Sequence, residues 1–119
     1  MKALILAAAA LTTAGASFAA TPDAARGEIT HLLDAVEKSG CKFQRNGTWH
    51  DARTARKHME KKFAYMDKRD LAPTAESFIE RGASTSSSSG KPYQMQCAGT
   101  TVTSGEWLTA QLKRHRGKN

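Results

Sequence analysis

Apolar residues recur at helical spacing in several parts of the chain. In the first part they occupy positions i, i+3, i+4 and i+7, as one face of an amphipathic helix requires; they are Ile29, Leu32, Leu33 and Val36. Before them, Thr21-Pro22-Asp23 suits a helix start, and after them Gly40 can take the left-handed conformation that ends a helix. We predict a helix over residues 22–38, with His31 partly buried beside its apolar face.

Three further helices follow from the same spacing and from their capping residues. Asp51 can cap a helix over residues 52–66, whose apolar face carries Ala52, Ala55, Met59, Phe63 and Met66. A shorter helix opens at Ala72-Pro73-Thr74 and runs until Gly82, its predicted stop. The last helix begins at Ser104 as its N-cap and ends in a basic turn that suits the helix dipole, Lys113-Arg114-His115-Arg116.

Alternating apolar and polar residues predict strands in two regions. Residues 41–50 read as a β-hairpin, because Asn46-Gly47 tolerates the positive φ angles of a type I′ turn. The alternating positions of this hairpin are Cys41, Phe43 and Trp49. A strand over 93–97 turns one face inward, and the chain turns away at 98–101; the inward residues are Tyr93, Met95 and Cys97. We therefore predict an α+β fold, with about four helices packed on a small three-stranded antiparallel sheet formed by hairpin 41–50 and strand 93–97.

The N-terminus has the features of a secretory signal peptide. Lys2 precedes an apolar run too short to span a bilayer, and Ser17-Phe18-Ala19 offers small residues three and one before a cleavage site. We predict cleavage after Ala19, with Ala20 as the alternative, and no cysteine follows the apolar run to carry a lipid anchor. Residues 20–119 then form a single small, soluble, exported domain without a transmembrane segment.

The two cysteines of the chain, Cys41 and Cys97, have no other partners. In an exported protein the oxidising compartment favours a bond between them. Closing this loop removes conformational entropy from the unfolded chain, which is worth roughly 4 kcal/mol. The alternatives are two buried free thiols or an exchanging thiol pair, and the latter lacks a C-x-x-C spacing.

The charge of the chain is basic. There are 18 lysines and arginines against 11 acids, and removal of Lys2 with the signal peptide leaves 17 against 11, or +6. The predicted second helix is the densest positive segment, with Arg53, Arg56, Lys57, Lys61 and Lys62. Outside the cytoplasm such a surface suits an unknown envelope protein or an anionic envelope component, and we expect no nucleic acid. A solvated surface that keeps the protein soluble is the simpler interpretation.

No motif specifies a reaction, a metal or a cofactor. His50 and His58 lack the spacing of a zinc site. The Ser-rich segment 83–92 is a flexible loop by composition, although its hydroxyl and N–H groups can also face an anion, and it lacks the first glycine of a P-loop. His58, Lys62 and Glu76 with a serine of this segment form the one hydrolase or transferase constellation that we consider.

Four segments together resemble the YfeK-like family of small exported bacterial proteins, which carry a domain of unknown function. They are Phe43-Gln44-Arg45-Asn46-Gly47, Ala55-Arg56-Lys57-His58-Met59, Thr74-Ala75-Glu76-Ser77-Phe78-Ile79 and Ser87-Ser88-Ser89-Gly90-Lys91-Pro92-Tyr93. The resemblance implies a periplasmic location and supplies no activity or site residues. It draws attention to the motif positions Arg45, Asn46, His58, Glu76, Gly90, Lys91 and Tyr93.

Two functional hypotheses remain beside the hydrolase. Ser89-Gly90-Lys91-Pro92-Tyr93 fits the S-G-x-x-Y pattern of periplasmic lysozyme inhibitors, but those proteins are β-barrels. We favour a non-enzymatic binding or interaction module of the cell envelope that uses the basic helix and the Ser-rich loop. Its candidate binding residues are Arg45, Asn46, Arg56, Lys57, His58, Lys61, Lys62, Glu76, Lys91 and Tyr93.

Overall fold

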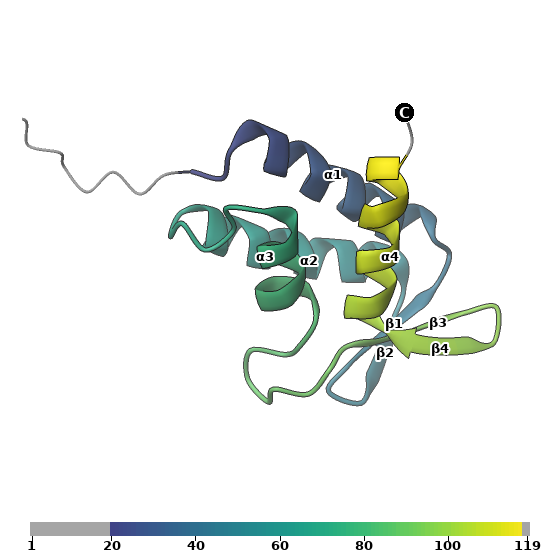
Figure 1. Cartoon of the computed structure of the whole chain (residues 1–119). Coiled ribbons are helices and arrows are strands. Elements are labelled where there is room, and N and C mark those ends of the chain that lie inside the picture. The colour runs from purple at the N-terminus through teal and green to yellow at the C-terminus, as the bar shows by residue number, and fades with distance from the viewer. Residues whose placement is uncertain (1–19, 118–119) are drawn as a thin grey trace, which may run out of the picture.

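The computed structural model describes residues 20–117, so the predicted signal peptide, residues 1–19, lies outside the described residues. The described chain is α+β, with helices on one face of a four-stranded antiparallel sheet (Figure 1). In chain order the elements are α1 (Asp23–Lys38), β1 (Lys42–Arg45), β2 (Thr48–His50), α2 (Ala52–Asp67), α3 (Ala75–Phe78), the π-helical turn η1 (Ile79–Ala83), β3 (Gln94–Cys97), β4 (Thr100–Thr103) and α4 (Ser104–Gly117).

The two long helices begin and end close to the predicted residues. Asp51 caps α2 as predicted, because its Oδ1 accepts a hydrogen bond from the Thr54 N–H at 2.8 Å. Gly40 follows α1 with φ +68°, the left-handed conformation predicted for it. The start of α1 differs, since Pro22 is the N-cap and the backbone N–H of Thr21 instead donates to Asp67 Oδ1 at 2.8 Å. Thr21, which precedes the N-cap of α1, is thereby hydrogen-bonded to the end of α2.

The sheet has the order β2-β1-β3-β4, and its register places one apolar row against the helices. Phe43 pairs with His50 on one side and with Met95 on the other, and Met95 pairs with Val102. Because side chains alternate between the two faces of a strand, these four residues share one face. The other face carries mainly glutamine and threonine. Figure 1 shows the helices on one side of the sheet only, which agrees with this polar outer face.

The prediction of three strands was wrong by one strand. The chain does turn at Ala98-Gly99, but it returns at once as β4 and pairs along the whole of β3. Ala98 has φ 51° and Gly99 has φ 84°, nearly the angles of Asn46 and Gly47 in the first hairpin. Alanine rarely adopts this conformation, which costs about 1–2 kcal/mol, so the turn carried no sequence signal.

Trp49 lies away from the core, in contrast to its predicted role in the hairpin pattern. It pairs with Gln44 rather than with Phe43, so it faces the polar side of the sheet, and it is 39% exposed. His50 occupies the helix-facing position instead. The two-residue Asn46-Gly47 turn sets this register, in which Cys41 and Phe43 are buried.

The third helix is short and changes character at its centre. Thr74 caps α3 by accepting from the Ser77 N–H at 3.0 Å, after which the chain continues into the π-helical turn η1. Gly82 does not end the helix as predicted; it lies buried inside η1. A Cβ at Gly82 would lie 2.7 Å from Met66 Sδ, so glycine here permits η1 to approach α2.

The last helix begins at Ser104, one residue later than its cap. The side chain that caps it belongs to Thr103, whose Oγ1 accepts from the Glu106 N–H at 3.3 Å, so the predicted cap at Ser104 was wrong by one position. Ser104 itself is fully buried, and its hydroxyl has no hydrogen-bond partner. Its N–H donates to Tyr93 O at 2.9 Å, which ties the start of α4 to the residue before β3.

A single hydrophobic core joins the helices to the inner face of the sheet. The largest fully buried side chains come from α1, α3, β3 and α4, and they are Phe78, Ile29, Leu32, Met95, Leu108 and Val36. Their burial accounts for the helical spacing of the apolar positions in the sequence.

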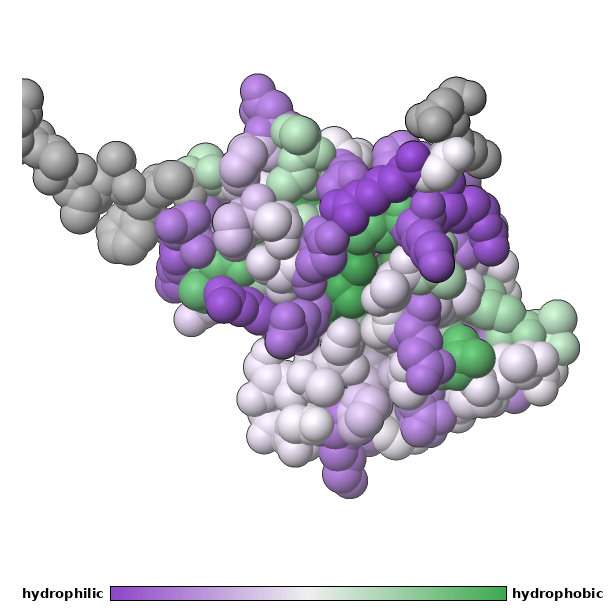
Figure 2. Space-filling model, in the orientation of Figure 1, coloured by the Kyte–Doolittle hydropathy of each residue, from purple (hydrophilic) through white to green (hydrophobic). Residues whose placement is uncertain are grey.

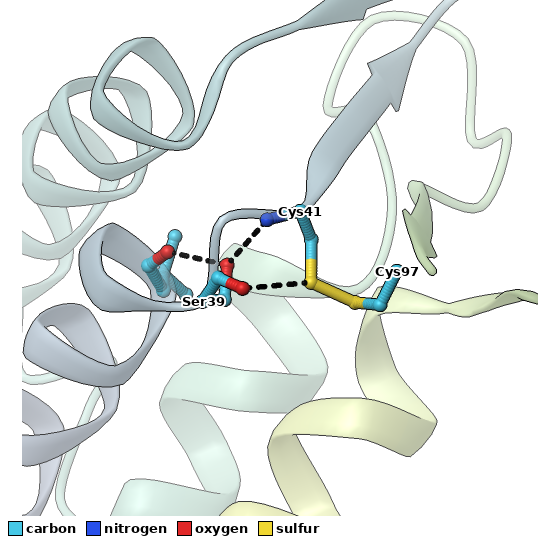
Figure 3. Close-up of a disulfide and its surroundings, with 4 residues drawn as sticks. Ser39, Cys41 and Cys97 are labelled. Atoms are coloured by element: carbon cyan, nitrogen blue, oxygen red, sulfur yellow. Dashed lines mark hydrogen bonds between the residues drawn. A yellow bond between two sulfur atoms is a disulfide. The ribbon is translucent and has the colours of Figure 1, made fainter. Parts of the chain in front are cut away.

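Cys41 and Cys97 form the predicted disulfide, which joins the residue before β1 to the end of β3 (Figure 3). The Cα atoms are 4.6 Å apart. Ser39 orders the neighbouring backbone, because its Oγ accepts from the Cys41 N–H at 3.1 Å and donates to Val36 O at 2.7 Å. The covalent bond therefore also fixes the sheet to the C-terminal end of α1.

Breaking this disulfide should destabilise the domain strongly. The bond spans 56 positions of sequence, and its loss should lower the free energy of unfolding by about 4 kcal/mol through unfolded-chain entropy. Denaturant unfolding of the oxidised protein and of the Cys41→Ser/Cys97→Ser variant measures the difference. The variant should not respond to reductant, and an unchanged midpoint after reduction of the native protein would contradict the expectation.

Substitution of Gly82 by alanine should test the close approach of η1 to α2. We expect Gly82→Ala to lower the free energy of unfolding by about 1–3 kcal/mol, because Met66 must move. Gly27→Ala is the matched control, because Gly27 lies in α1 with no heavy atom within 4 Å of a built Cβ. This variant should raise the free energy of unfolding by up to about 1 kcal/mol. Equal effects on the two denaturant midpoints would refute the steric explanation.

Candidate functional site

Three of the candidate side chains meet where α2 faces the residue before β3. The hydroxyl of Tyr93 lies 3.1 Å from His58 Nε2 and 2.9 Å from Lys62 Nζ. Lys62 also donates to Thr85 O at 3.0 Å, and its Nζ lies 4.9 Å from the centre of the Tyr93 ring. His58 and Lys62 share one face of α2 because they are four residues apart.

The donors and acceptors of this cluster follow from the chemistry of lysine and histidine. An ammonium group can only donate, so the Tyr93 oxygen accepts from Lys62. The bond between Tyr93 and His58 takes its direction from the imidazole tautomer: an unprotonated Nε2 accepts from the phenol, and a protonated Nε2 donates to it. Burial, together with the nearby charges of Arg45 and Lys62, lowers the pKa of His58 to about 4, so its imidazole is neutral at pH 7.

The pKa values of the other two groups also reflect burial. Burial raises the pKa of Tyr93, so its phenol stays protonated at neutral pH. Burial lowers the pKa of Lys62, and the positive charge of Arg45 adds to this effect. A half-buried ammonium thus stands near a guanidinium, an arrangement that an anion would stabilise.

The Ser-rich loop lies next to this cluster and is attached to the turn of the first hairpin. Asn46 Nδ2 donates to Ser86 Oγ at 3.1 Å, and Ser89 Oγ donates to Asn46 Oδ1 at 2.6 Å. Backbone hydrogen bonds from Ser86 N to Lys91 O and from Gly90 N to Ser86 O close the loop on itself. The segment expected to be flexible is therefore tied to the β1–β2 turn. Figure 2 shows it as a pale lobe below the helices.

The other candidates lie elsewhere. Arg56 faces α1 and forms ion pairs with three carboxylates, Asp34 and Glu60 at 2.7 and 2.8 Å and Glu37 at 3.5 Å. Glu76 is exposed and binds Arg116 on α4, which lowers the Glu76 pKa to about 2. The structure thus divides the predicted basic face and separates Glu76 from His58.

Lys61, Lys57 and Lys91 keep exposed side chains. Within residues 20–117, none of these three lysines forms an ion pair with a carboxylate, and the same is true of Arg45 and Lys62.

A cleft of about 470 Å³ opens beside this cluster, between α2, the turn after it, η1 and the Ser-rich loop. It contains no carboxylate; its residues are His58, Lys61, Lys62, Tyr65, Met66, Leu71, Arg81 and Ser87. By contrast, a cleft of about 300 Å³ beside α4 carries Glu76 and Glu80 and no basic residue. Sequence reasoning missed Arg81 and the apolar members, because nothing in a single sequence shows that η1 folds back on α2.

A smaller cavity of about 50 Å³ is also lined by His58. Phe43, Ala55 and Met59 give it apolar walls, and Arg45 and His50 contribute polar groups. This volume admits one or two water molecules or a single small group. His58 therefore lines both the small cavity and the larger basic cleft.

The geometry gives little support to hydrolytic chemistry. Among the described residues no serine hydroxyl is hydrogen-bonded to His58, since its Nε2 faces Tyr93. Ser86, Ser88 and Ser89 bond to Asn46 or to one another instead. In the same part of the chain no three His, Cys, Asp or Glu side chains are grouped to hold a metal ion.

A family model described as a family of unknown function, DUF5329, matches residues 23–116. The chain belongs to this family. It is also similar to the uncharacterized protein YfeK of Salmonella typhimurium, with 34% identity over 94 residues that cover 78% of this chain and 77% of that protein. No solved structure matches the chain. The comparisons confirm the YfeK-like resemblance and assign no activity.

The DUF5329 match spans every helix and strand of the domain, from the start of α1 to the last turn of α4. Three of the four segments that carried the resemblance, those with Asn46, His58 and Tyr93, converge on the cluster and its loop. The fourth contributes α3 and Glu76. None of the helices in the described range is both long and apolar enough to cross a membrane.

The low pKa of His58 should make the stability of the domain depend on pH. Between pH 6.5 and about 4 the unfolded chain binds more protons at this position than the folded chain, so stability is present above pH 6.5 and is lost as the pH falls. Side-chain NMR should show His58 titrating near pH 4. In the His58→Asn variant the loss of stability from pH 7 to pH 5 should be smaller. Titration near 6.5 would contradict the assignment.

Proposed function

We propose that this protein is an exported, non-enzymatic binding module that holds an anionic component of the cell envelope, or an acidic face of an envelope protein, in the cleft beside α2. Export is supported by the expected signal peptide and by the Cys41–Cys97 disulfide, which suits an oxidising compartment. The periplasm is the compartment that the family resemblance implies.

The observation that carries the proposal is the grouping of unpaired positive charge around a cleft. Lys61, Lys62 and Arg81 line it without a carboxylate, and Arg45 is close enough to depress the pKa of Lys62. A cleft with low-dielectric walls and one sign of charge concentrates the field and attracts the opposite charge. The arginines that have structural roles, Arg26, Arg56 and Arg116, are paired with carboxylates instead.

Binding is better supported than the two alternatives. A hydrolase would need His58 as a base, and a histidine with a pKa of about 4 whose Nε2 is hydrogen-bonded to Tyr93 is a weak one. In the segment that fits the lysozyme-inhibitor pattern, residues 89–92 are exposed, but Tyr93 is 4% exposed and Ser89 is bonded to Asn46, so two residues of the pattern are engaged within the domain. Both remain less well supported than an anion-binding role.

Removing two charges from the rim of the cleft should weaken anion binding without unfolding the domain. Lys61 and Arg81 are exposed and form no ion pair within the described range. We expect Lys61→Gln/Arg81→Gln to raise the Kd for sulfate at least about tenfold, as charge-assisted hydrogen bonds are lost. Backbone amide NMR shifts during a sulfate titration, at ionic strength fixed with chloride, give the Kd.

The control for this measurement is Lys38→Gln/Lys113→Gln, which removes the same net charge from α1 and α4. Neither residue lines the cleft. The control should bind sulfate as the native protein does. If both double variants weaken binding equally, the attraction comes from overall charge and the proposed site is wrong.

A further inference from the structure

The basic cleft is divided along the axis of α2 into a charged end and an apolar end. His58, Lys61 and Lys62 come from one turn of the helix, and Tyr65 and Met66 come from the next turn. A shift of four residues moves about 6 Å along a helix. The side chains that α2 contributes to the cleft therefore change from cationic to mainly apolar over roughly that distance.

Further residues extend this division. At the charged end, the Ser87 side of the loop faces α2, and Lys62 is held against Thr85 O. At the apolar end, Leu71 adds an aliphatic wall beside Met66, which is 3% exposed. Arg81 reaches this end from η1 and donates to Leu71 O at 3.4 Å, so one cation borders the apolar wall.

The aromatic side chain at the apolar end is held in place although it is exposed. Tyr65 is 56% exposed, and the guanidinium of Arg69 lies 3.6 Å from the centre of its ring. Arg69 also donates to Tyr65 O at 3.0 Å, so the stacked pair is fixed at two points. A large exposed aromatic ring with a fixed position offers a ready contact for an apolar group.

We infer that the cleft takes a small amphiphilic anion. Its sulfonate, phosphate or carboxylate group lies at Lys61 and Lys62, and its apolar part lies along Tyr65, Met66 and Leu71. This inference rests on the proposed anion-binding function and adds the apolar half of the ligand. The volume of about 470 Å³ suits a single small molecule.

The cleft suits a ligand that has left the bilayer rather than a membrane surface. A helix that binds a bilayer presents a protruding apolar face flanked by basic residues. Here Met66 is buried at the base of the cleft, and the basic side chains of Lys61 and Arg81 form its rim. A monomeric amphiphile can enter such a recess, whereas the interior of a membrane cannot.

Three matched compounds test the two halves of the ligand separately. 1-Octanesulfonate carries head and tail, methanesulfonate carries the head alone, and octyltrimethylammonium carries the same tail with the opposite charge. Calorimetry or amide NMR on residues 20–119, below micelle concentrations, gives each Kd. We expect 1-octanesulfonate to bind at least about tenfold more tightly than methanesulfonate, because the tail removes apolar surface from water. Octyltrimethylammonium should bind more weakly than either.

Each other outcome overturns a different statement. Equal binding of the two sulfonates would remove the apolar half and leave the proposed anion-binding function intact. Absence of binding by both would remove the proposed function and this inference together. Equal binding of 1-octanesulfonate and octyltrimethylammonium would show a plain hydrophobic pocket. Sedimentation with anionic phospholipid vesicles that 1-octanesulfonate does not displace would favour a membrane surface and refute the inference.

Two substitutions locate the tail. Tyr65→Ser changes an exposed side chain and should leave the fold intact, and Leu71→Gln changes the aliphatic wall. Each should reduce the advantage of 1-octanesulfonate over methanesulfonate by about threefold or more, while the Kd of methanesulfonate stays the same. Trp49→Ser, on the distant polar face of the sheet, is the control for loss of an exposed aromatic ring. A control effect equal to that of Tyr65→Ser would contradict the placement of the tail.

Discussion

The ammonium group of Lys62 is the point at which the parts of the site depend on one another. It joins α2 to the Ser-rich loop through Thr85 O and to the residue before β3 through the Tyr93 hydroxyl. Its charge also adds to the burial and to the Arg45 charge that lower the pKa of His58, so the imidazole beside Tyr93 is neutral at pH 7. The positive charge itself is not neutralised by a carboxylate within the described residues. The Lys62 side chain thus makes hydrogen bonds that hold the site together and also carries a positive charge that no carboxylate of the described residues neutralises.

The fold was predictable from the sequence where local chemistry and tertiary packing agree. Asp51 and Gly40 have the roles that their types predict, and Asn46-Gly47 forms the expected turn. The fourth strand was not predictable, because its turn places Ala98 at a positive φ and β4 contains a single apolar residue. The prediction for Gly82 was wrong because glycine is favoured both at the C-terminal end of a helix and where two segments approach closely, as η1 and α2 do here.

The site was predictable only in part, for a geometric reason. Helical periodicity places His58 and Lys62 on one face of α2, and family resemblance drew attention to Tyr93, but only the tertiary structure brings Tyr93 to them. Arg56 belongs to the same basic run, yet it faces α1 and its charge is neutralised there. Charge density along the sequence therefore overstated the positive charge that is left unpaired. The apolar half of the cleft comes from separate segments, whose approach no local pattern predicts.

The most direct test of the unpaired charge is the pKa of His58 measured by NMR in sodium sulfate and in sodium chloride of equal ionic strength. Sulfate does not change its charge between pH 4 and 8, so it can report the cluster alone. An anion bound near Lys62 and Arg45 would offset the charges that depress this pKa, and the account predicts a higher pKa in sulfate than in chloride. The same His58 pKa in both salts would contradict an anion site at this cluster. This holds whether sulfate saturates the protein elsewhere or shows no binding at all.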